Sequence, residues 1–147
     1  LGEDRSLWGL VGLLHDCDLG ETEGDFSRHG VVGAEMLRAE GLDETICRAV
    51  EAHATHAGCQ PESTMERALV AADQLTGLVT AAALVHPTKS VAALKVKSLK
   101  KRMKEKRFAA GVSREAIRSC EGFGLEVPEF LGLGAEAMAG VADQLGL

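Results

Sequence analysis

The dipeptide His15-Asp16 places an imidazole and a carboxylate side by side at the end of a short apolar stretch. Both groups bind divalent metals when the histidine is neutral and the aspartate is ionised. Three more candidate ligands, His29, His53 and Asp73, follow within predicted helices. These residue types indicate a metal site whose ligands come from several helices.

Each of the three later residues also has a plainer interpretation. Asp73 lies in the middle of a predicted helix between small and apolar neighbours, where aspartate competes for backbone hydrogen bonds. It is either an exposed residue on a polar helix face or a buried carboxylate that needs a partner or a metal. His29 and His53 lie on apolar helix faces, so each is either a hydrogen-bonded core histidine or a ligand.

The order and spacing of these residues resemble the HD-domain superfamily of metal-dependent phosphohydrolases. That family's pattern is a His, then His-Asp, then a distant Asp. The resemblance implies that His15, Asp16 and Asp73 hold one ion, with Asp16 in the catalytic role. It also implies that His29 and His53 can hold a second ion, with Asp16 as the bridge. The family's first His lies on an earlier helix, and the sequence starts too late to contain it. We therefore expect an N-terminally truncated domain.

The resemblance implies hydrolysis of a nucleotide or another small phosphate ester with one or two divalent ions. A bound ion makes hydroxide available near neutral pH and stabilises charge on the phosphoryl oxygens. Mixed imidazole and carboxylate ligands suit Mn, Fe, Ni, Co or Zn better than Mg. The alternative is a non-catalytic HD-fold domain that binds a phosphorylated ligand or a protein partner. The chain has no Tyr, whereas the cyclic-dinucleotide phosphodiesterase branch has a signature ending in Gly-Tyr-Pro.

The elements that must position these residues are all predicted to be helices, because period-2 alternation of β-branched residues is nearly absent. Caps, apolar periodicity and Gly or Pro breakers predict helices at about 6–16, 27–41, 43–58, 63–86, 90–107, 113–124 and 128–146. We therefore expect a compact all-α HD-type domain of six or seven helices, with residues 1–147 forming a single domain.

The net charge of −6 conceals a basic segment at residues 89–107, which has nine Lys or Arg and one acid. The other residues carry 7 basic and 21 acidic side chains, about −14 in total, and this negative charge disfavours general nucleic-acid binding. Four lysines share one helix face and are candidates for binding substrate phosphates: Lys97, Lys100, Lys101 and Lys104. The alternative is an ordinary solvated face.

Four widely spaced cysteines, without a CxxC pair, predict reduced thiols in a cytoplasmic protein. Two other sites have weaker support: a structural zinc site from Cys17, His53, His56 and Cys59, and a nucleophilic Cys17. No apolar run is long enough to span a membrane. If the upstream helix is absent, the apolar face of residues 7–14 is partly uncovered, so we expect a homodimer.

Overall fold

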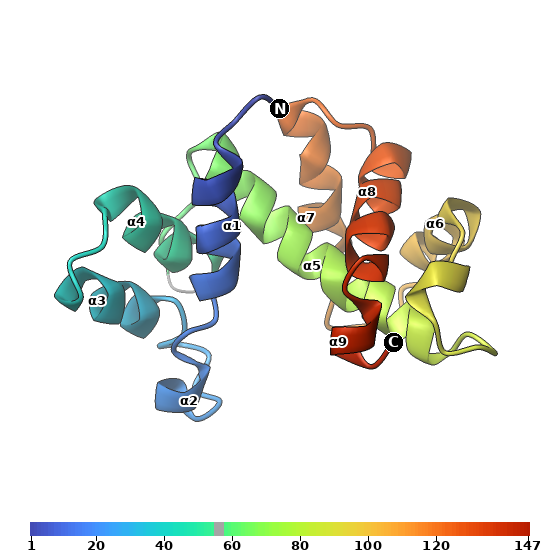
Figure 1. The fold of residues 1–147 in the computed structure, drawn as a ribbon, viewed down its shortest axis with the longest axis horizontal. Coiled ribbons are helices and arrows are strands. Elements are labelled where there is room, and N and C mark those ends of the chain that lie inside the picture. Colours follow the sequence, from blue (N-terminus) through green and yellow to red (C-terminus); the bar gives the residue numbers. More distant parts are fainter. Residues whose placement is uncertain (55–57) are drawn as a thin grey trace. The chain divides into compact units, whose positions relative to one another are not determined.

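The computed structural model describes residues 1–54 and 58–147 of the chain (Figure 1). Within these residues the regular structure is entirely helical, which confirms the predicted all-α class. The chain divides into two compact units, Leu1–Val70 and Ala71–Leu147. No helix among the described residues is both long and apolar enough to span a membrane. The prediction of a single HD-type domain over residues 1–147 stays a prediction.

The first unit holds the helices that carry the His-Asp dipeptide and both later histidines. Its helices are α1 (Arg5–Leu14), α2 (Leu19–Thr22), α3 (Val31–Ala39), α4 (Glu44–His53) and the first residues of α5 (Thr64–Leu84). Helix α4 contacts both α1 and α3. Its buried residues include Cys47, Ala49 and Val50, which share a core with Val11 of α1 and Ala34 of α3. This packing fixes the end of α1 against α4.

The second unit contains the rest of α5 and every later element. These elements are η2 (Val91–Ala93), α6 (Val96–Lys104), α7 (Arg114–Arg118), η3 (Ser119–Phe123), α8 (Val127–Ala139) and α9 (Ala142–Leu145). Helix α8 contacts both α6 and η2. The core of this unit includes Leu75 and Leu78 of α5, Leu99 of α6 and Leu131 of α8, all fully buried.

Several predicted helix starts are confirmed by their hydrogen bonds. The Asp43 carboxylate accepts from the Thr45 backbone N–H and caps α4. At the start of α5, Ser63 Oγ accepts from the backbone N–H of Glu66, and the Glu66 carboxylate accepts from the Ser63 N–H. This reciprocal pair is a capping box. Helix α1, predicted to start at about residue 6, begins at Arg5 and is capped by Asp4, whose carboxylate accepts from two N–H groups.

Two predicted helices are shorter in the structure, and one loop is more ordered. The predicted helix at 27–41 begins only at Val31, because a turn stabilised by Asp25 and a left-handed Gly30 precede it. His29 therefore lies in this turn and not on a helix face. The predicted helix at 90–107 is split into η2 and α6 by extended backbone at Leu94 and Lys95. Residues 17–26, which lie between the first two predicted helices, contain the short helix α2.

Candidate metal centre

His15 and Asp16 follow directly after α1, where the helix ends and the chain turns. The His15 ring places Nδ1 2.8 Å from the carbonyl oxygen of Gly12, one turn back along α1. Its Nε2 lies 3.3 Å from Oδ2 of Asp16. The Asp16 side chain keeps 43% of its surface exposed, so its carboxylate is open to solvent. The dipeptide thus presents one imidazole nitrogen and one accessible carboxylate together.

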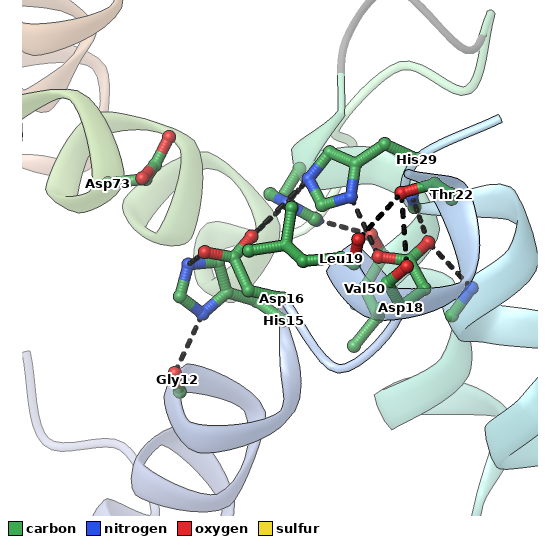
Figure 2. Close-up of polar contacts among 12 residues, drawn as sticks. Gly12, His15, Asp16, Asp18, Leu19, Thr22, His29, Val50 and Asp73 are labelled. Atoms are coloured by element: carbon green, nitrogen blue, oxygen red, sulfur yellow. Dashed lines mark hydrogen bonds and ion pairs between the residues drawn. The ribbon is translucent and has the colours of Figure 1, made fainter. Parts of the chain in front are cut away.

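His29 and His53 bring two more imidazoles to the same carboxylate. His53 is the last residue of α4, and His29 precedes α3. Oδ1 of Asp16 lies 3.3 Å from Nε2 of His29 and 3.5 Å from Nε2 of His53. Figure 2 shows this meeting of His15, Asp16 and His29 beside the end of α1. One ligand atom each from His15, Asp16 and His53 lie within 4.8 Å of one another.

The opposite nitrogen of each ring has a hydrogen-bond acceptor. Nδ1 of His15 faces the Gly12 carbonyl, Nδ1 of His53 faces the Val50 carbonyl at 2.5 Å, and Nδ1 of His29 faces Oδ1 of Asp18 at 2.7 Å. An acceptor at Nδ1 favours the tautomer that carries its proton there, which leaves a lone pair on Nε2. All three Nε2 atoms are therefore prepared to act as ligands.

The spacing of two of these atoms fits a shared cation. Nε2 of His29 and Nε2 of His53 are 3.0 Å apart, although neither has a proton to donate in the favoured neutral tautomer. A cation between the two lone pairs, either a shared proton or a metal ion, removes their repulsion. Two nitrogens that bind one ion at about 2.1 Å with a right angle between them lie about 3.0 Å apart. The residues present thus fit a metal ion.

Asp18 supports this arrangement from a fully buried position, with 0% of its surface exposed. Its Oδ1 accepts from His29, and its Oδ2 accepts from the backbone N–H groups of Gly30 and Gly33, at 2.8 and 2.9 Å. A Cβ at Gly33 would lie 3.3 Å from this carboxylate, so the glycine leaves room for it. Asp18 lies between the first two predicted helices and is not among the candidate site residues named from the sequence. An acid two residues after His-Asp was the available signal.

The pKa values of the buried groups follow from their surroundings. Burial lowers the pKa of His53, and the neighbouring His15 and His29 lower it further, which keeps its ring neutral. Burial raises the pKa of Asp18, but the hydrogen bonds from Gly33, His29 and Gly30 outweigh it, so the pKa is lower than usual. The carboxylate of Asp18 is therefore charged at neutral pH.

The environment of Cys17 argues against a nucleophilic thiolate. Burial and the negative charge of Asp18 raise the pKa of Cys17. A raised pKa keeps the thiol protonated, and the thiol is a weaker nucleophile than the thiolate. The alternative zinc site included His56, which lies outside the described residues, and all four cysteines are free.

The remaining predicted site residues belong to the second unit. Asp73 is half-buried on α5, where its Oδ2 accepts a hydrogen bond from Gln74 Nε2 at 2.9 Å. Its role as a metal ligand stays a prediction. The four candidate phosphate-binding lysines are all exposed on α6, namely Lys97, Lys100, Lys101 and Lys104. The structure thus brings together His15, Asp16, His29 and His53 within the first unit.

Comparison with known protein families agrees with this geometry. The family model of the HD domain matches residues 1–78, which include the four clustered residues. The chain belongs to the HD-domain family. HD domains are helical, and the family includes metal-dependent phosphohydrolases.

Curated relatives share the same region. An uncharacterised protein of Methanocaldococcus jannaschii is 43% identical over 72 residues, 49% of this chain and 41% of that protein. A tRNA (cytidine(56)-2'-O)-methyltransferase of Picrophilus torridus is 31% identical over 100 residues, 68% of this chain and 28% of that enzyme. The enzyme of the same name from Thermoplasma volcanium is 39% identical over 66 residues, 45% of this chain and 19% of that enzyme. The HD chain thus matches less than half the length of each relative. No solved structure matches it.

Proposed function

We propose that this HD domain is a metal-dependent phosphohydrolase that acts on a nucleotide or another small phosphate ester. The observation that carries the proposal is the convergence of three Nε2 atoms on the two oxygens of Asp16. Each ring has its other nitrogen held by an acceptor, so the site is organised before any ion arrives. A histidine that only makes hydrogen bonds within a protein core does not require two further imidazoles beside it. The cluster of three therefore favours metal ligation over that alternative.

The residues divide into those that hold an ion and those that orient them. His15, Asp16, His29 and His53 would hold the metal, and Asp18 fixes the ring of His29. When bound, a divalent ion supplies a water of lowered pKa and positive charge for phosphoryl oxygens. The exposed Asp16 carboxylate leaves this side of the cluster accessible to a phosphate. With three imidazoles available, Mn, Fe, Ni, Co or Zn is favoured over Mg.

The experiment is metal analysis of purified wild-type protein and of Asp16→Asn and His53→Gln, after incubation with Mn or Ni. We expect about one or two ions in the wild type and most of that content lost in both variants. Hydrolysis of p-nitrophenyl phosphate should fall in parallel. His86→Gln is the matched control, because His86 lies in the second unit, where its Nδ1 contacts the neighbouring Thr88.

Two outcomes separate the proposal from its alternatives. A wild-type protein that binds no added metal, or variants that retain all of it, contradicts the metal site. Metal binding without hydrolysis of any nucleotide or phosphomonoester favours a non-catalytic HD domain that binds a phosphorylated ligand or a partner.

A further inference from the structure

The second unit carries a basic face on α6. The apolar residues of this helix, Leu99 and Met103, are buried in the core of the unit. The helix therefore turns its lysines outward, and four of them follow one stripe along it: Lys97, Lys100, Lys101 and Lys104. From Lys97 to Lys104 the stripe extends for about 10 Å along the helix axis at 1.5 Å per residue.

Two hollows flank this lysine stripe. One has a volume of about 380 Å³ and is lined by His86, Leu94 and Ser98, among others. The other, of about 420 Å³, is lined by Val96, Pro128, Lys100 and Lys104, among others. Lys97 and Lys101 line both hollows, and no Asp or Glu of the residues that the structure describes lines either of them. Each hollow thus combines an apolar floor with cations at its edge.

The positive charge of the stripe is largely uncompensated. Glu105 is the acid on this segment, and it pairs with Arg102 at 2.6 Å, which also stacks on Phe108. Lys101 lies 4.0 Å from the same carboxylate. In residues 1–54 and 58–147, Lys97, Lys100 and Lys104 make no ion pair with an acid. Three cations therefore face solvent without a partner.

We propose that this lysine stripe binds single-stranded nucleic acid, with phosphates on the lysines and a ribose or base in the flanking hollows. The acidity of the whole chain weighs against such binding, but charges beyond about 8 Å are largely screened at physiological salt. The attraction for a phosphate group at the stripe is therefore set by the charges that line the two hollows, which are those of lysines. Phosphate contacts carry no base preference, so RNA and DNA of equal length should bind alike.

The exposure of the lysines distinguishes this partner from two others. An exposed lysine gains little from one phosphate, whereas a strand that neutralises several lysines releases several counterions at once. A single phosphomonoester is thus a poor fit. A membrane surface is favoured when large apolar side chains accompany the lysines, and the large apolar residues of α6 are buried.

The test is fluorescence anisotropy with labelled 20-nucleotide poly(U) and poly(dT), in the presence of a chelator so that no metal-dependent reaction consumes the probe. We expect both strands to bind at low salt. The slope of log K against log salt should be about −3 if about four phosphates are neutralised. Lys97→Ala/Lys101→Ala should weaken binding about tenfold or more and reduce the slope to about −1.5.

The charge-matched control is Arg5→Ala/Arg28→Ala, which removes two exposed cations from the first unit. It should keep wild-type affinity, and circular dichroism should show both double variants folded. Equal losses in the two double variants, or no binding by the wild type at low salt, overturns the proposal. Displacement of the strand by low-millimolar inorganic phosphate, or lysine-dependent binding to phosphatidylserine vesicles without binding to the strands, also overturns it.

Discussion

Asp18 shows how one buried side chain prepares a site that it does not enter. Its two oxygens accept three hydrogen bonds, from His29, Gly30 and Gly33. These bonds tie the ring of His29 to the start of α3. A carboxylate is the only side chain of this size that offers acceptors alone on both branches. The Asp18 carboxylate therefore both stabilises this turn and orients the ring of His29.

Replacing Asp18 by Asn should lower both the stability of the fold and the affinity for metal. The amide turns one branch into a donor that faces another donor, so we expect the unfolding free energy to fall by about 1–3 kcal/mol. Metal affinity should fall about 10-fold to 100-fold, as is usual when a partner of a ligating histidine is lost. Urea unfolding with chelator and calorimetric titration with Mn measure the two effects. Glu21→Gln, an exposed acid of the same segment, should change neither. An unchanged metal affinity in Asp18→Asn would remove its orienting role.

The candidate ligands could be predicted from the sequence, but their support could not. His15 and Asp16 could be predicted as ligands because two adjacent residues with metal-binding side chains follow a predicted apolar helix. His29 was predicted on a helix face, yet it lies in a turn whose geometry depends on Gly30 and on the distant α4. Asp18 is one of four acids between the predicted helices at 6–16 and 27–41. The folded structure is needed to show that Asp18 is buried, because the backbone groups that donate to it belong to Gly30 and Gly33, which are distant in sequence.

Among the elements, the turn between α2 and α3 holds the site together. Gly30 has a φ of +80°, and a Cβ there would lie 2.6 Å from Cβ of Ala54, just after α4. This close approach places His29 against His53. The position therefore needs glycine for its backbone conformation and for its space.

A pair of glycine variants separates these two needs. Gly24→Ala changes a residue with a φ of +84° and no atom near its Cβ, so it should cost only the backbone term, about 1–2 kcal/mol. Gly30→Ala adds a steric clash and should cost about 1–3 kcal/mol more. Chemical unfolding of both variants measures the difference. Equal losses would show that the contact with Ala54 is relieved at no cost.

Helix starts were more predictable than helix continuity. The caps at Asp43 and at Ser63-Glu66 are local, since each donor lies within three residues of its acceptor. The break between η2 and α6 is not local in this sense. It allows both Val91 and Leu99 to enter the core of the second unit, and nothing in the spacing of the lysines indicates it. Tertiary packing therefore decides where a predicted long helix is interrupted.

At the scale of the molecule, α1 retains exposed apolar surface. Val11 is buried as predicted for the apolar face, but Leu10 and Leu13 are 40% and 80% exposed. We predict that the chain forms a homodimer through this surface. Leu13→Lys should shift the mass measured by light scattering toward the monomer, whereas Leu133→Lys, at an exposed leucine of α8, should not. A wild-type monomer at high concentration contradicts the prediction.

Metal binding should also stabilise the folded chain, because the clustered ligands come from the end of α1, the turn before α3 and the end of α4. These segments are separate in an unfolded chain, so an ion binds the folded state preferentially. At a free metal concentration of 100 times Kd, the gain is about 2.7 kcal/mol. The melting midpoint should then rise by roughly 5 to 15 °C. A thermal melt with and without Mn measures this shift, which His53→Gln should abolish and His86→Gln should retain. An equal shift in both variants would mean that the ion binds elsewhere, and the cluster around Asp16 would then be a structural network of histidines.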